Sequence, residues 1–193
     1  MLGLKLLTDP RWANIAEKNL EVILTDHAWC EQKAASNAIS IITQNPEHKE
    51  LVEVLTDIAI EEMEHFKMVI EIIYARGYTL GREEKDHYVG QLFKFMKKDG
   101  SRNQALIERL LFAAMIEARS CERFRVLYQN IEDKELAKFY YELMVSEANH
   151  YTVFLNFARE LSESGDVEKR WQEWLKFEGE LITSYGKKEF VHG

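Results

Sequence analysis

Two stretches of the chain place a glutamate and a histidine three residues apart, Glu62-Met-Glu-His65 and Glu147-Ala-Asn-His150. Residues with this spacing lie on one face of a helix. Both pairs fall within apolar runs that would otherwise form a buried helical stripe. Carboxylate oxygens and imidazole nitrogens without thiolates suit iron or manganese. The two stretches are therefore candidate halves of a metal site.

A carboxylate partner for the first pair is Glu31, on the apolar stripe of the preceding helix. In an antiparallel helical hairpin, residues at the same level are equally far from the turn. Glu31 and Glu62 are centred between Pro46 and Glu47, beside the turn signal Asn45-Pro46. The spacing predicts that Glu31 meets the first pair.

The second pair has an equivalent partner in Glu117. Glu117 and Glu147 are centred on Glu132, inside the expected turn at residues 130–133. Two other Glu-x-x-His matches fail this test, because partners for Glu84…His87 and Glu189…His192 would be centred within helices. We interpret the first as a solvated first helical turn and the second as a tail.

The chain thus contains E-x30-E-x2-H followed by E-x29-E-x2-H. One Glu from each of two helices, with Glu-x-x-His from two others, is the pattern of di-iron and di-manganese carboxylate sites. Four buried carboxylates need compensating charge, which two divalent ions would supply. The predicted metal ligands, also the predicted catalytic residues, are Glu31, Glu62, His65, Glu117, Glu147 and His150. The alternative is that they are ordinary surface residues on helices with a narrower apolar stripe.

The elements that position these residues are all predicted to be helical. Apolar spacing predicts long helices over about 11–43, from the Asn45-Pro46 turn to Gly77, over 106–128 and over 140–158. A shorter crossover helix is expected at 83–98, and a last helix at about 166–184 packs outside the others. This order predicts an all-α fold, a ferritin-like four-helix bundle with a long helical crossover and an extra C-terminal helix. One domain over residues 1–193 is expected.

Composition limits the environment and the partners. Two cysteines, Cys30 and Cys121, are too few for a disulfide framework or a cysteine-rich metal site, and are expected to be small packing residues. No apolar run approaches the ~20 residues of a membrane span, and no signal peptide is evident. A cytoplasmic monomer without membrane attachment is expected. The net charge of −8 argues against nucleic acid as a partner if the charge is uniform.

The charge is not uniform along the chain. Residues 76–109 contain eight basic and five acidic side chains, so this segment carries +3 and the rest carries −11. From charge alone, a solvated crossover helix is the favoured interpretation.

The stretches LTDHAWCEQKAA, EEMEHF, IEARSCERF and SEANHY occur here in the order and spacing of a known family. From about Thr8 to Leu161 the chain resembles the tRNA 2-methylthio-N6-isopentenyladenosine hydroxylases, a group of ferritin-like di-iron proteins. It departs from the usual pattern at Asn149, where the family has Arg, and at Trp29, which replaces a smaller residue.

The resemblance implies O2-dependent hydroxylation of the isopentenyl side chain of the hypermodified adenosine next to the tRNA anticodon. It implies two iron ions as cofactor, with manganese a possible substitute, and O2 as co-substrate. Electrons would come from a separate reductase, because no flavin or iron–sulfur motif is visible. It also favours RNA docking on the basic segment, with Lys94, Lys97, Lys98 and Arg102 as the candidate residues.

Other interpretations remain open at this point. A ferritin-like protein that oxidises or stores iron, a peroxidase or manganese catalase, and a metal-free helical interaction module would share parts of the pattern. His27 is expected to support a ligand or pack in the core rather than be a seventh ligand. Five aromatic residues in and next to the predicted helix at 140–158 could line a substrate pocket, though core packing is favoured: Phe139, Tyr140, Tyr141, Tyr151 and Phe154.

Overall fold

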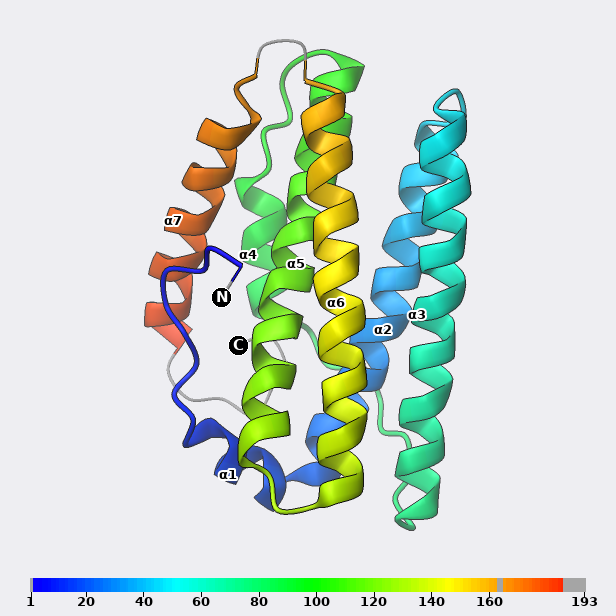
Figure 1. Cartoon of the computed structure of the whole chain (residues 1–193), viewed down its shortest axis with the longest axis vertical. Helices are drawn as coiled ribbons and strands as arrows, with labels where there is room; N and C mark the ends of the chain where they lie inside the picture. Colours follow the sequence, from blue (N-terminus) through cyan, green and yellow to red (C-terminus); the bar gives the residue numbers. More distant parts are fainter. Residues whose placement is uncertain (1, 163–164, 186–193) are drawn as a thin grey trace. The chain divides into compact units, whose positions relative to one another are not determined.

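The computed structural model describes residues 2–162 and 165–185, and within them every regular element is an α-helix (Figure 1). The helices are α1 (Trp12–Lys18), α2 (Leu20–Gln44), α3 (Lys49–Ala75), α4 (His87–Phe95), α5 (Arg102–Asn130), α6 (Lys134–Glu160) and α7 (Val167–Tyr185). The all-α prediction is confirmed. The chain forms two compact units, residues 18–85 and the described residues of 2–17 and 86–185. The expectation of one domain over the whole chain stays a prediction.

The α2–α3 unit, residues 18–85, is an antiparallel helical hairpin (Figure 1). Its turn lies at residues 45–48, where Asn45 and Pro46 were expected to end the first helix. The Asn45 side chain donates to the carbonyl of Ile41 at 2.9 Å and satisfies a carbonyl at the end of α2. A shared apolar stripe is buried, including Ile23, Leu24, Leu55 and Val69.

One predicted helix is interrupted. The region 11–43 is not continuous, because Asn19 leaves the helical conformation with φ −131° and ψ 39°. Asparagine competes with the backbone for hydrogen bonds, so it is a weak point in a helix. On the N-terminal side, Trp12 is buried, and the Arg123 guanidinium lies 4.2 Å from the centre of its ring. Tertiary packing of α1 therefore overrides the continuous apolar pattern.

The crossover helix is shorter than predicted at its start. It begins at His87 rather than 83, because the Asp86 side chain caps it by accepting the Val89 N–H at 2.9 Å. The preceding segment instead lies along α2. The Trp29 indole donates to the carbonyl of Gly81 at 3.0 Å, and a Cβ at Gly81 would lie 3.1 Å from the Thr25 methyl group.

The crossover helix also ends early, at Phe95 rather than 98. The Lys97 N–H donates to Glu108 at 3.1 Å instead of to a helical carbonyl. Glu108 in turn binds the buried Arg170 of α7 at 2.6 and 2.8 Å, and Arg170 also donates to the carbonyl of Phe95 at 3.0 Å. These hydrogen bonds stop α4 and hold α7 against it, within the same unit.

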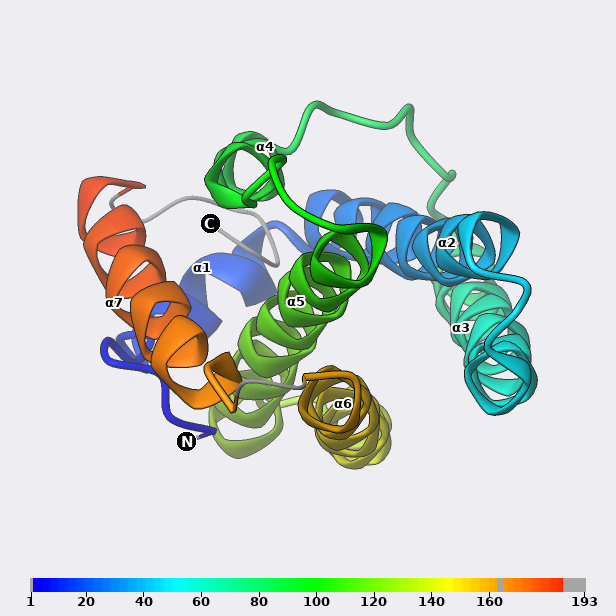
Figure 2. The same ribbon diagram turned by 90° about the horizontal axis from the view of Figure 1, so that it is seen from above.

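The α5–α6 unit comprises residues 2–17 and 86–185 and has a second antiparallel hairpin. Its turn lies at residues 131–133, as the sequence predicted. Ser101 and Gln104 form a capping box at the start of α5, and Asp133 caps α6. From above, α4, α7 and α1 gather around α5 on sides that α6 leaves open (Figure 2). As a result α5 is buried around most of its circumference.

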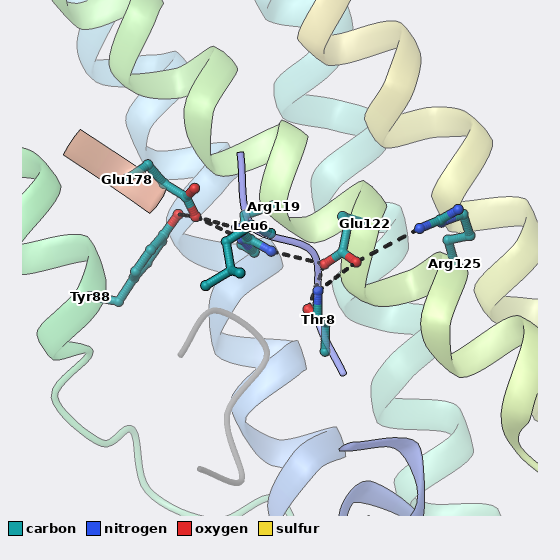
Figure 3. A network of polar contacts seen from close by, with 7 residues as sticks. All are labelled: Leu6, Thr8, Tyr88, Arg119, Glu122, Arg125 and Glu178. Carbon is teal, nitrogen blue, oxygen red and sulfur yellow. Dashed lines mark hydrogen bonds and ion pairs between the residues drawn. The ribbon is translucent and has the colours of Figure 1, made fainter. Parts of the chain in front are cut away.

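A buried polar network joins four segments of this unit at Arg119 of α5 (Figure 3). Arg119 donates to Glu178 of α7 at 2.5 and 2.8 Å, to Glu122 at 2.9 Å and to the carbonyl of Leu6 at 3.0 Å. Tyr88 of α4 also donates to Glu178, at 3.1 Å. Burial raises the pKa of Glu178, and the charge of Arg119 acts against that rise.

The same network holds the N-terminal segment. The Thr8 hydroxyl and amide donate to Glu122 at 2.6 and 3.0 Å (Figure 3). Glu122 therefore accepts hydrogen bonds from α5 and from the N-terminal segment at once. Removing the shared arginine would leave two buried carboxylates without their main cation.

We expect Arg119→Met to lower the free energy of unfolding by about 3–5 kcal/mol, because it breaks buried ion pairs by deleting one partner. Urea unfolding followed by tryptophan fluorescence measures the change. The control is Lys67→Met, which removes an exposed pair with Glu71 on α3 and should cost at most about 0.5 kcal/mol. Equal losses in the two variants would contradict the prediction.

Candidate metal centre

Three of the predicted ligands converge within the α2–α3 unit. Glu31 lies on α2, and Glu62 and His65 lie one turn apart on α3, all buried. One ligating atom from each lies within 4.8 Å of the other two. The His65 Nδ1 atom is 3.6 Å from Glu31 Oε2 and 3.7 Å from Glu62 Oε2. We call these residues the first trio.

The charges of the first trio are coupled to one another. Burial alone would lower the pKa of His65, but the negative charges of Glu31 and Glu62 close to it raise the pKa to about 10. Burial would raise the pKa of Glu31, yet His27 and His65 hold it well below its usual value. The raised pKa favours protonated His65, whose charge compensates part of the charge of the two carboxylates.

His27 supports the trio from one turn earlier on α2. Its Nε2 atom lies 2.6 Å from Glu31 Oε1, and the side chain is fully buried. A histidine hydrogen-bonded to a ligating carboxylate fixes the orientation of that carboxylate. This contact agrees with the expectation that His27 supports a ligand.

The other three predicted ligands converge within the α5–α6 unit. Glu117 lies on α5, and Glu147 and His150 on α6, again all buried. One ligating atom from each lies within 4.8 Å of the others. This second trio has the same composition as the first, two carboxylates and one imidazole.

Cys121 lies one turn after Glu117 and is not a thiolate. Its Sγ atom donates to the carbonyl of Met144 at 3.2 Å. Burial, with the nearby charge of Glu117, raises the pKa of the thiol to about 12. Cys121 is buried, as a packing residue is expected to be, whereas Cys30 is only half-buried.

The residues with decoy spacing behave differently. Glu84 and His87 are exposed. Glu84 precedes α4 instead of lying in its first turn, so that detail of the prediction was wrong. Glu189 and His192 lie outside the described residues.

The five aromatic residues of α6 that were expected to pack in the core differ in burial, and Tyr151 is half-buried. Phe139, Tyr140 and Phe154 are buried, and Tyr140 stacks on Phe124 with ring centres 5.5 Å apart, as core packing predicts. Tyr141 is exposed and contacts Tyr128 at 5.0 Å, so for Tyr141 the core interpretation was wrong. Because an α-helix has 3.6 residues per turn, the adjacent Tyr140 and Tyr141 lie on different faces of α6.

The basic residues that the family resemblance favoured for RNA docking all reach solvent. Lys94 lies in the last turn of α4, Lys97 and Lys98 in the connection to α5, and Arg102 at the first residue of α5. The structure therefore corrects one detail, because only Lys94 is on the crossover helix. Within the described residues no helix is both long enough and apolar enough to cross a membrane.

The sequence did not reveal the Arg119 network. The one sequence feature that could have indicated it is the density of charged residues in IEARSCERF. Arg119, Glu122 and Arg123 of this stretch point away from the ligand stripe and are nevertheless buried. Charged residues on several faces of a helix normally indicate solvent. Here they indicate a helix surrounded by protein.

The donor set fits a pair of hard or borderline divalent ions. Each trio supplies oxygen and imidazole nitrogen without thiolate, which is the preference of iron and manganese. Each is buried and carries more carboxylate than imidazole, so a bound cation would remove uncompensated negative charge. The buried carboxylate–histidine clusters are compatible with metal binding.

We expect iron(II) binding to release a proton from His65, because a ligating imidazole must be neutral and this one has a pKa of about 10. Affinity should therefore rise by about tenfold per pH unit for that proton, between about pH 7 and about pH 9. Anaerobic calorimetry in buffers of different ionisation enthalpy measures the release. His87→Ala should keep it and His65→Ala should lose it; equal release from both variants would refute the assignment.

Comparison with known proteins adds an independent observation. The model of the family described as tRNA-(MS[2]IO[6]A)-hydroxylase (MiaE) matches residues 3–193. A curated relative from Pseudomonas putida, named tRNA 2-(methylsulfanyl)-N(6)-isopentenyladenosine(37) hydroxylase, is 34% identical over 177 residues, 92% of this chain and 85% of its own length. A relative with the same name from Salmonella typhimurium is 27% identical, covering 91% of this chain and 81% of its own.

A solved structure agrees on the fold. It is described as protein 43 with aldehyde deformylating oxygenase activity from Synechococcus, with a TM-score of 0.91 and 28% identity over 98% of this chain and 95% of its own. The ferritin-like fold class predicted from the sequence is confirmed. With the family match over nearly every residue, the chain belongs to the tRNA-(MS[2]IO[6]A)-hydroxylase (MiaE) family.

Proposed function

We propose that this protein is a di-iron monooxygenase that hydroxylates the isopentenyl side chain of the hypermodified adenosine next to the tRNA anticodon. The observation that carries the proposal is the family match over residues 3–193, whose curated relatives are named as hydroxylases of this nucleoside. At the coarser level the protein is an enzyme, a hydroxylase of the tRNA-modifying class.

The two trios are the proposed iron ligands. Each trio offers two glutamates and one histidine, so the six residues match the di-iron carboxylate pattern. Four carboxylates would balance the charge of two divalent ions.

The proposed reaction needs O2 and two electrons from outside the protein. The substrate C–H group, O2, two electrons and two protons yield the alcohol and water. Bound iron supplies the activation of O2, for which no amino-acid side chain is suited. A separate reductase is the proposed electron donor, and its identity is open.

The side chains of this chain orient and shield that chemistry. His27 holds the Glu31 carboxylate in position at 2.6 Å. Burial of all six proposed ligands excludes bulk water from them. The raised pKa of Cys121 keeps a nearby sulfur protonated, so it does not compete as a thiolate ligand.

The basic segment is the proposed contact with tRNA. Phosphate contacts position a nucleic acid and require only a local basic surface, so the overall charge of −8 does not prevent binding. Lys94, Lys97, Lys98 and Arg102 are exposed and close in sequence, as such a contact needs. A modified base can leave a single-stranded loop to reach a buried site.

We expect Glu62→Ala and Glu147→Ala to abolish hydroxylation, because each substitution removes a proposed metal ligand. The matched controls Glu84→Ala and His87→Ala share the spacing but are exposed, and should keep nearly full activity. Mass spectrometry of tRNA nucleosides from cells lacking the protein, complemented with each variant, measures the product. Loss of product in all four would refute the ligand assignment, and product in cells without the protein would refute the function.

Charge reversal at Lys94, Lys97 and Lys98 should weaken tRNA binding and flatten its dependence on salt, because fewer counterions are released. Binding is measured as a function of salt concentration, and the absorption spectrum of the iron-loaded protein should not change. Unaltered affinity would place the docking surface elsewhere on the protein.

A further inference from the structure

We propose that the exposed ring of Phe93 on α4 is a stacking platform for an unpaired base of the RNA substrate, with Lys94 and Lys98 holding adjacent phosphates. The inference rests on the proposed function, since it takes RNA as the substrate. It adds to the proposed basic contact surface a residue that would distinguish single-stranded from double-stranded RNA.

Phe93 is exposed although its helix has an apolar face to bury. Tyr88, Leu92 and Met96 recur every fourth residue and are buried within the α5–α6 unit. Phe93 lies beside this stripe and keeps 46% of its surface exposed. Leaving a phenyl ring in water forgoes a large part of the free energy that burial would give, so exposure here fits a binding role better than a packing role.

The exposed ring is also held in place. Phe112 of α5, which is buried, packs against it edge to face, with ring centres 6.0 Å apart and planes at 85°. A ring fixed on one side loses little conformational freedom when a base stacks on it. Phe95, two residues later, shows the contrast, because its ring stacks at 4.1 Å on Phe177 within the unit.

The cations around Phe93 differ in their availability. The Lys98 ammonium lies 5.7 Å from the centre of the Phe93 ring. Lys94 is exposed, and the described part of the chain shows no ion pair for it. Lys97 instead pairs with Glu173 at 3.8 Å. Lys94 and Lys98 are therefore the better candidates for phosphate contacts beside the ring.

This combination matches a single-stranded nucleic acid better than a duplex. Proteins that bind single strands pair basic side chains with exposed aromatic rings, because every unpaired base offers a flat face. In a duplex the base faces are already stacked on each other. Within the described residues 87–102, Phe93 is the one exposed large apolar side chain, which is less than the apolar core of a typical protein interface. An acidic protein partner is therefore the weaker alternative.

The test compares a synthetic stem-loop RNA with a fully paired duplex of the same length, using the full-length protein. Phe93→Leu should weaken stem-loop binding at least about fivefold, the loss expected for one stacked base, and leave duplex binding and the salt dependence unchanged. Phe93→Tyr keeps a ring and should bind as the wild type does. Charge reversal of Lys94 and Lys98 should weaken binding to both RNAs.

A second measurement reports contact directly. Tryptophan placed by Phe93→Trp should gain fluorescence that stem-loop RNA quenches and duplex RNA does not. The control Ile60→Ala removes an exposed apolar side chain on α3, among acidic neighbours, and should not alter binding.

The outcomes separate this inference from the proposed function. Equal effects of Phe93→Leu on both RNAs, or equal losses in Phe93→Leu and Phe93→Tyr, would overturn stacking while RNA binding stands. Wild-type protein that binds neither RNA, yet binds an acidic protein through the same lysines, would overturn both RNA docking and the inference. Stem-loop binding that depends on the ring supports it.

Discussion

Buried carboxylates and the groups that compensate them are the constraint on which the rest of this structure depends. A carboxylate without water needs a cation or several hydrogen-bond donors, or it loses its charge. In the α5–α6 unit, Arg119 serves Glu122 and Glu178, and Arg170 serves Glu108. Each of these arginines also holds a separate piece of chain in place. The unit is therefore fastened at the same points at which its charges are neutralised.

In the first trio, histidines rather than arginines compensate the buried carboxylates. Glu31 receives a hydrogen bond from His27, and His65 is drawn into its protonated form between two glutamates. His65 lies 3.6 Å from Glu31 and 3.7 Å from Glu62 and interacts with both carboxylates. A site in which a proton acts as a substitute cation is well prepared to exchange that proton for a metal ion. The structural carboxylates Glu108, Glu122 and Glu178 are thus paired with arginines, which stay charged. The proposed ligands Glu31 and Glu62 lie beside His65, which can lose its proton.

Helix α5 connects these two kinds of site, because it carries Glu117 and Arg119 only two residues apart. Residues two apart on a helix point to nearly opposite sides. One side of α5 thus presents a proposed ligand, while the other is locked to α7, to Glu122 and to the N-terminal segment. Rigid support behind a ligand keeps the ligand in position. Because α5 has buried functional or structural contacts on both of these sides, it is buried around most of its circumference.

The sequence by itself determined the helical class, both hairpin turns and the composition of each trio, because helical periodicity, capping residues and equal distance from a turn are local or nearly local properties. Only the tertiary structure decided the break at Asn19, the short α4 and the roles of Arg119 and Arg170. These depend on segments far apart in the chain, as when Leu6, Tyr88 and Glu178 meet one region of α5. From the sequence alone, a charged residue is predicted to be exposed to solvent. Its burial depends on a partner from a distant segment, which only the folded structure identifies.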